Sequence, residues 1–152
     1  MAYVPVKEVV DDLMQLMRAW AGFTEASVVF RKGPVRALRT SETPRPVIIL
    51  TCLGLPAGEE GAGSGNHWWH NWQLQVSLLV PDDIDDPEGA EDLRYDLLEE
   101  FMDFVHENRT LLTSYKVGRV ASVEFLFSTL TDDGQQVYRA CRIVLGYKTL
   151  KA

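Results

Sequence analysis

The spacing of apolar residues changes several times along this chain, and the resulting order of elements limits which folds it can form. Apolar side chains recur at helical spacing in residues 6–20 and again in residues 86–108. Five other runs are β-branched or alternate in polarity and predict strands at residues 26–30, 47–53, 72–80, 119–130 and 135–147. The predicted order is therefore α-β-β-β-α-β-β. It indicates an α+β fold, a mostly antiparallel or mixed sheet of about five strands packed against two helices.

Residues at the ends of these runs indicate where the elements begin and end. Gly22 is expected to end the first helix. Asp86 and Pro87 suit the N-cap and first residue of the second helix. Asp132-Asp133-Gly134 favours a hairpin turn between the last two strands. The run at 47–53 is almost entirely apolar, which predicts a central strand covered on both faces.

Length and composition predict a single domain over residues 1–152. The chain is 46% hydrophobic, which is ample for a core of that size. Two long loops are expected, at residues 31–46 and 54–67, because Gly-Pro and Pro-Arg-Pro interrupt the first and five glycines occur in the second.

Charge is unevenly distributed. The net charge of −7 argues against a general binder of nucleic acid or of anionic membranes. Residues 82–107 carry twelve acids and one base, whereas residues 31–45 carry five bases and one acid, and the residues from Asn108 onward carry seven bases and three acids. Opposite patches of this kind would let copies of one chain attract each other, although each patch alone also fits a solvated surface. The basic candidates for an interface are Arg31, Lys32, Arg36, Arg39 and Arg45.

No motif for catalysis, a cofactor or a metal is found in the chain. The glycines at 54–65 lack the Lys-Ser/Thr end of a phosphate loop, and the acids at 82–86 lack the spacing of a calcium loop. His67 and His70 would face one metal only if their segment were helical. We therefore assign no catalytic, cofactor-binding or metal-ligating residue and expect no enzyme activity. Cys52 and Cys141 lie in apolar runs, which predicts buried free thiols in a reducing compartment.

Several large side chains are candidates for contacts with other proteins. Trp68 and Trp69 are neighbours, so on a strand they point to opposite sides and one of them is expected to lie off the core. Together with His70 they adjoin the glycine-rich loop, a position typical of interface anchors. Arg139 interrupts the apolar face of the last strand, which suggests an edge or an interface.

The layout resembles that of the tail terminators, the lambda-type tail-completion proteins of long-tailed phages. The parts that carry this resemblance are the helix at 6–20, the long helix at 86–108 and the final hairpin of 119–130 with 135–147. The two long loops between the early strands also suit the pattern. The resemblance implies a homohexameric ring that caps the tail tube and joins it to the head–tail connector.

The partners implied by the resemblance are the tail tube protein and the connector, with DNA passing through the pore without specific binding. Its place would be the virion neck, and the host cytoplasm during assembly. One alternative is another ring-forming neck, connector or tail-tube protein, although the long helix argues against a tube subunit. A second alternative is a small α+β enzyme or ligand-binding domain with a pocket near Trp68, His70 and Arg139.

Overall fold

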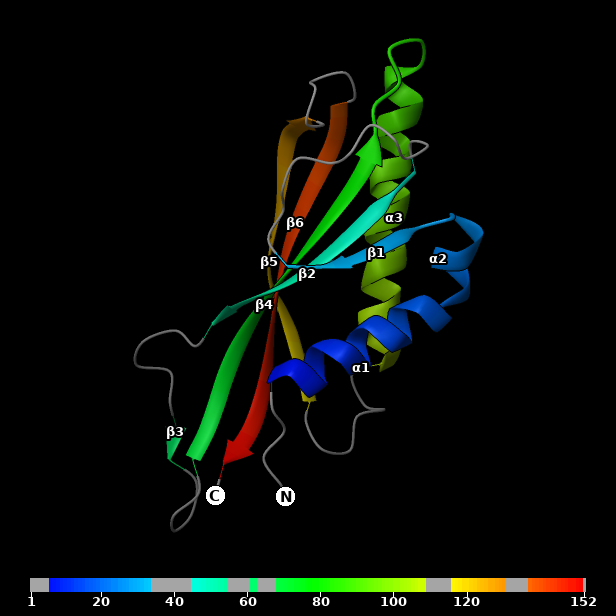
Figure 1. Ribbon diagram of the computed structural model, residues 1–152. Helices are drawn as coiled ribbons and strands as arrows, with labels where there is room; N and C mark the ends of the chain where they lie inside the picture. The colour runs from blue at the N-terminus through cyan, green and yellow to red at the C-terminus, as the bar shows by residue number, and fades with distance from the viewer. Residues whose placement is uncertain are drawn as a thin grey trace.

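A mixed sheet with helices packed against it makes up the part of the chain that the structure, a computed structural model, describes (Figure 1). That part comprises residues 6–33, 45–54, 61–62, 68–108, 116–130 and 137–151. Its elements are α1 (Val6–Ala19), α2 (Ala21–Glu25), β1 (Val29–Lys32), β2 (Val47–Gly54), β3 (Gly61–Ala62), β4 (Trp68–Pro81), α3 (Pro87–Asn108), β5 (Lys116–Leu130) and β6 (Val137–Lys151). The predicted α+β fold with its five-strand mixed sheet is confirmed.

The strand order is β1-β2-β4-β6-β5, with β3 paired to β4 off this path. Only the β1–β2 pairing is parallel; the other described pairings are antiparallel. A parallel pair needs a crossover of about a dozen residues or more, because the chain must return along the sheet before it re-enters it. The fourteen residues at 33–46 supply that length, so the loop expected there has a topological reason.

Alternate residues of β2, β4 and β6 form a buried face against which the helices pack. Ile48, Leu74 and Ile143 are fully buried there, together with Leu13 of α1 and Phe101 of α3. Aromatic rings tie the helices to one another, since the Phe104 ring centroid lies 5.6 Å from Trp20, 5.8 Å from Phe23 and 6.0 Å from Phe101. Burial of such rings supplies a large share of core stability.

The opposite face of the sheet is also buried at β2. Val47 and Ile49 form a second apolar cluster with Leu79, Tyr138 and Ala140, whereas the alternating Ile48 and Leu50 belong to the helix-covered face. The prediction that this strand is covered on both faces is therefore confirmed.

Several predicted boundaries are wrong. Gly22 does not end the first helix: α1 ends at Ala19, extended Trp20 separates the two helices, and Gly22 lies within the short α2. The first strand begins at Val29, three residues later than expected. The strand expected at 72–80 begins at Trp68, and β3 lies inside the range expected to be a loop.

The N-terminal end of α3 is capped, and the helix is shorter than the strands beside it. Asp86 caps α3 as predicted, because its Oδ1 accepts the Gly89 N–H at 3.0 Å. The helix has 22 residues, or about 33 Å at 1.5 Å per residue. The 14 residues of β4 span about 46 Å at 3.3 Å per residue. Accordingly, β4 and β6 run past the C-terminal end of α3 (Figure 1).

Candidate functional site

The basic residues proposed from sequence lie at the β1 edge of the sheet, where they are described. Arg31 and Lys32 end β1, and exposed Arg45 precedes β2, whereas Arg36 and Arg39 lie outside the described residues. Lys32 Nζ donates to Asp11 Oδ1 on α1, and Lys7 Nζ lies 3.6 Å from the other oxygen of the same carboxylate. The hydrogen bond from Lys32 is the main reason that the pKa of Asp11 lies below its usual value.

Apart from Arg142 of β6, whose 41% exposed side chain pairs with Glu124, the exposed bases among the residues whose side chains the structure describes lie at this edge. They are Lys7, Arg18, Lys32 and Arg45, and we call them the basic edge. Lys7 and Arg18 lie on the same stripe of α1 as Asp11, given 3.6 residues per turn. Asp11 in turn contacts Lys32 of β1. These bases therefore mark the β1 side of the sheet.

The tryptophan–histidine segment begins β4. Trp68, Trp69 and His70 pair along the backbone with Lys151, Leu150 and Thr149 of β6. From Trp68 onward the segment is a strand, so the helical arrangement that two histidines would need for one metal is absent at His70. The side chains of Trp68, Trp69 and His70, and all of His67, lie outside what the structure describes, and their role in an interface stays a prediction.

Arg139 lies far from that segment along the sheet. It pairs with Val80, which is ten residues beyond His70 on the same strand, a separation of roughly 33 Å. Trp68, His70 and Arg139 therefore cannot line one pocket, and the ligand-binding alternative loses the site expected for it.

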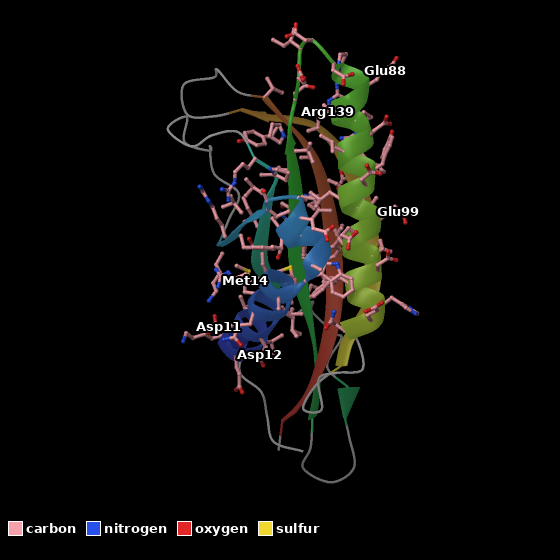
Figure 2. The ribbon with its side chains drawn as sticks, turned by 90° about the vertical axis from the view of Figure 1, so that its right-hand side faces the viewer. Asp11, Asp12, Met14, Glu88, Glu99 and Arg139 are labelled. Carbon is pink, nitrogen blue, oxygen red and sulfur yellow. The ribbon has the colours of Figure 1, made fainter. Side chains whose placement is uncertain are left out.

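Arg139 contacts the start of α3 instead. Its Nε donates to Asp82 Oδ1 at 2.8 Å and its Nη1 donates to Glu91 Oε2 at 2.5 Å. These bonds raise the pKa of Arg139, with Asp82 contributing most. Because β6 lies between β4 and β5, the edge position, one of the two expected for Arg139, is wrong, whereas its place in an interface stays a prediction. Figure 2 shows Arg139 beside the first turns of the helix.

Glu91 links this pair to a second arginine. Arg94 donates to Glu91 through Nε at 3.1 Å and through Nη2, and its Nη1 donates to the backbone oxygen of Ala140 at 3.1 Å. Burial raises the pKa of Glu91, but the hydrogen bonds from Arg94 and Arg139 outweigh it and hold that pKa below its usual value. These contacts hold the N-terminal part of α3 against β6.

Beyond Arg94, exposed apolar side chains gather where α3 meets β5. The Arg94 guanidinium carbon lies 4.9 Å from the ring centroid of Phe125, and Tyr95 meets the same ring edge-on at 5.8 Å. Phe125 is 46% exposed, Tyr95 47% and Val123 39%. We call these three residues the aromatic edge patch. The strand predicted at 119–130 does not reveal this patch, because alternation in β5 indicates only that Val123 and Phe125 share a face.

Six exposed carboxylates run along the outer side of α3, next to this patch. They are Glu88, Asp92, Asp96, Glu99, Asp103 and Glu107, and we call them the acidic stripe. Figure 2 shows Glu88 and Glu99 on the side of the helix turned away from the sheet. Neighbouring like charges at helical spacing repel one another, so the stripe lowers helix stability slightly rather than raising it.

The described residues contain no group of three or more His, Cys, Asp or Glu side chains placed to hold a metal ion. None of the described helices is long and apolar enough to cross a membrane. Cys141 is buried and unpaired as predicted, whereas the side chain of Cys52 lies outside what the structure describes. Comparison with known proteins finds no matching family model and no matching curated protein.

Proposed function

We propose that this chain is a structural virion protein of a long-tailed phage, a tail terminator that forms a ring at the end of the tail tube. The observation that supports the proposal is the order of the longer elements, α-β-β-β-α-β-β once the five-residue α2 and the two-residue β3 are set aside, with an N-terminal helix and a second long helix before the final hairpin. That order belongs to the family that the sequence resembles.

The distribution of charge supports ring formation by this chain. A cyclic ring is closed by one surface of each copy meeting a different surface of the next. Here the basic edge and the acidic stripe, both defined from the described side chains, lie toward different edges of one sheet. The net charge of −7 also suits a pore that carries DNA, because repulsion of phosphate keeps the nucleic acid from sticking.

In this proposal the ring is a hexamer in the virion neck, assembled in the host cytoplasm. Its axial partners are the tail tube protein on one side and the head–tail connector on the other. DNA passes through without specific binding. The ring works by ending tube growth and offering a joining surface, so no catalytic group is needed.

The first test is the solution mass of the purified chain, measured by light scattering coupled to sizing at low and moderate salt. Six copies of the 17.2 kDa chain give about 103 kDa, and electron micrographs of that fraction should show rings with an open pore. A stable dimer without a ring would contradict the proposal.

A second test separates a terminator from another neck ring or a connector. Tube protein from the same genome is allowed to polymerise with and without the chain. A terminator should shorten the tubes and remain bound at one end of each. Tubes of unchanged length would instead favour a connector.

A further inference from the structure

The aromatic edge patch has the form of an anchor for another protein. Three of the five large apolar side chains that are exposed among the described residues gather there, while Ile84 and Leu93 lie elsewhere. Arg94 holds the Phe125 ring in place from within the chain and Tyr95 meets its edge. A half-exposed aromatic pair that is already fixed loses little conformational freedom on binding, which is typical of interface hot spots.

The patch lies along an open edge of the sheet. β5, a strand of 15 residues, pairs with β6 alone, so among the described residues no strand lies along its other side. Long edge strands with exposed apolar side chains tend to associate with other chains unless something covers them. Backbone pairing and an aromatic anchor are therefore available at one place.

The charges beside the aromatic edge patch favour one kind of partner over another. Two copies meeting patch to patch would bring their acidic stripes together, and the carboxylates would repel one another. On the basic edge Lys7 and Lys32 pair with Asp11, so Arg18 and Arg45 supply the opposite charge, and this edge lies toward β1, at the other end of the strand order. We infer that the aromatic edge patch and acidic stripe of one copy bind the basic edge of a second copy of this chain, in a head-to-tail contact.

This contact leaves each copy with one free patch and one free basic edge. Repetition therefore gives a closed ring if the rotation per copy closes, and an open chain if it does not. The inference rests on the proposed function only for closure into a ring. The contact itself is a separate claim and can be tested separately.

The test uses two variants that each keep one half of the contact. Phe125→Asp breaks the patch and keeps the basic edge, whereas Arg18→Glu/Arg45→Glu reverses the basic edge and keeps the patch. All three residues are exposed or half-exposed, and circular dichroism checks that each variant folds. Each variant alone should be monomeric, with association weakened roughly tenfold or more. An equal mixture should give a 1:1 heterodimer of about 34 kDa, twice the mass of the chain.

The matched control is Leu93→Asp, which adds the same charge at an exposed apolar position of α3 outside the patch and should assemble like the wild type.

A Phe125→Asp variant that still assembles would overturn the inference and leave the ring intact. Self-association of the basic-edge variant alone would show patch-to-patch contact and also overturn it. Heterodimers from the mixture, with wild-type chain forming open filaments, would support the inference and contradict the proposed ring. A wild-type chain that stays monomeric at every concentration and salt would overturn both.

Discussion

Arg139 on β6 donates from Nη1 to Glu91 Oε2 on α3 at 2.5 Å, across 48 residues of sequence. The strand position of Arg139 places it on the same face as buried Cys141 and Ile143, where an unpaired cation would be unfavourable. Glu91 and Asp82 supply the opposite charge, and Arg94 shares the Glu91 carboxylate. The pairing thus satisfies the charged residue on this face of β6 and fixes the start of α3 to the sheet.

Replacing this cation should destabilise the fold. We expect Arg139→Gln to lower the melting temperature by several degrees, because it leaves the Asp82 and Glu91 carboxylates short of a partner in a partly buried place. Arg142→Gln on the same strand is the control. Its ion pair with Glu124 is 41% and 52% exposed, and such surface pairs contribute little. Equal melting temperatures for the two variants would show that the network around Arg139 does not stabilise the fold.

The same network should make stability depend on pH in the acid range. The pKa of Glu91 is lower in the folded chain than its ordinary value of 4.5. The contribution of Glu91 to the free energy of unfolding is therefore complete above about pH 5. It is lost as the pH falls through the pKa that Glu91 has in the folded chain. We expect Glu91→Gln to have a lower melting temperature than the wild type at pH 7. Between about pH 5 and pH 3 its melting temperature should fall less steeply than that of the wild type. Glu99→Gln, which removes an equal charge from the exposed side of α3, should leave the slope of the decline unchanged.

Much of the fold follows from local pattern. Helical spacing and the Asp86 cap place α3 to within one residue, and strict alternation places the centres of β4, β5 and β6. The start of β4 was missed, because Trp68 to Asn71 do not alternate and are held by pairing with Lys148 to Lys151. β3 was missed for a similar reason, since its two residues are in a strand only through their pairing with Trp68 and Trp69.

The candidate site was less predictable, because its contacts join residues that are distant in sequence. Alternation places Phe125 on one face of its strand and helical spacing places Tyr95 beside the acids. Neither pattern shows that β5 is the edge strand or that α3 lies beside it. Of the basic edge, Lys32 and Arg45 were named from sequence, but their proximity depends on the parallel β1–β2 pairing, which periodicity does not reveal. Lys7 and Arg18 were not named, because only the contact of α1 with Lys32 brings them to that side.

Gly22 shows how a long-range contact overrides a local signal, and it leads to a further prediction. Trp20 Nε1 donates to Glu100 Oε1 at 2.5 Å, and a Cβ at Gly22 would overlap the Glu100 carboxylate. We expect Gly22→Ala to displace Glu100 and to destabilise the chain by about 1 kcal/mol, the typical value of such a hydrogen bond. Unfolding in urea measures this change in the free energy of unfolding. Glu100→Ala should cost a similar amount and the double variant little more, because both changes remove one interaction. Additive losses would show that Gly22 acts through something other than Glu100.

Cys141 leads to a prediction about thiol reactivity. Burial raises its pKa to about 11, although the nearby Arg94 charge opposes the shift, and the side chain is 0% exposed. The thiolate is the reactive form, and at pH 8 it would make up roughly one part in a thousand of such a thiol. In a Cys52→Ala background, which leaves one cysteine, we expect iodoacetamide to label the native chain very slowly at pH 8 and the urea-unfolded chain rapidly. Because the sheet closes faster than iodoacetamide reacts, labelling of the native chain should be slower than that of the unfolded chain by the small fraction of molecules in which the sheet is open. Labelling of the native chain at the rate of the unfolded chain would mean that this face of β6 is open to solvent, contrary to the packing of α3 upon it.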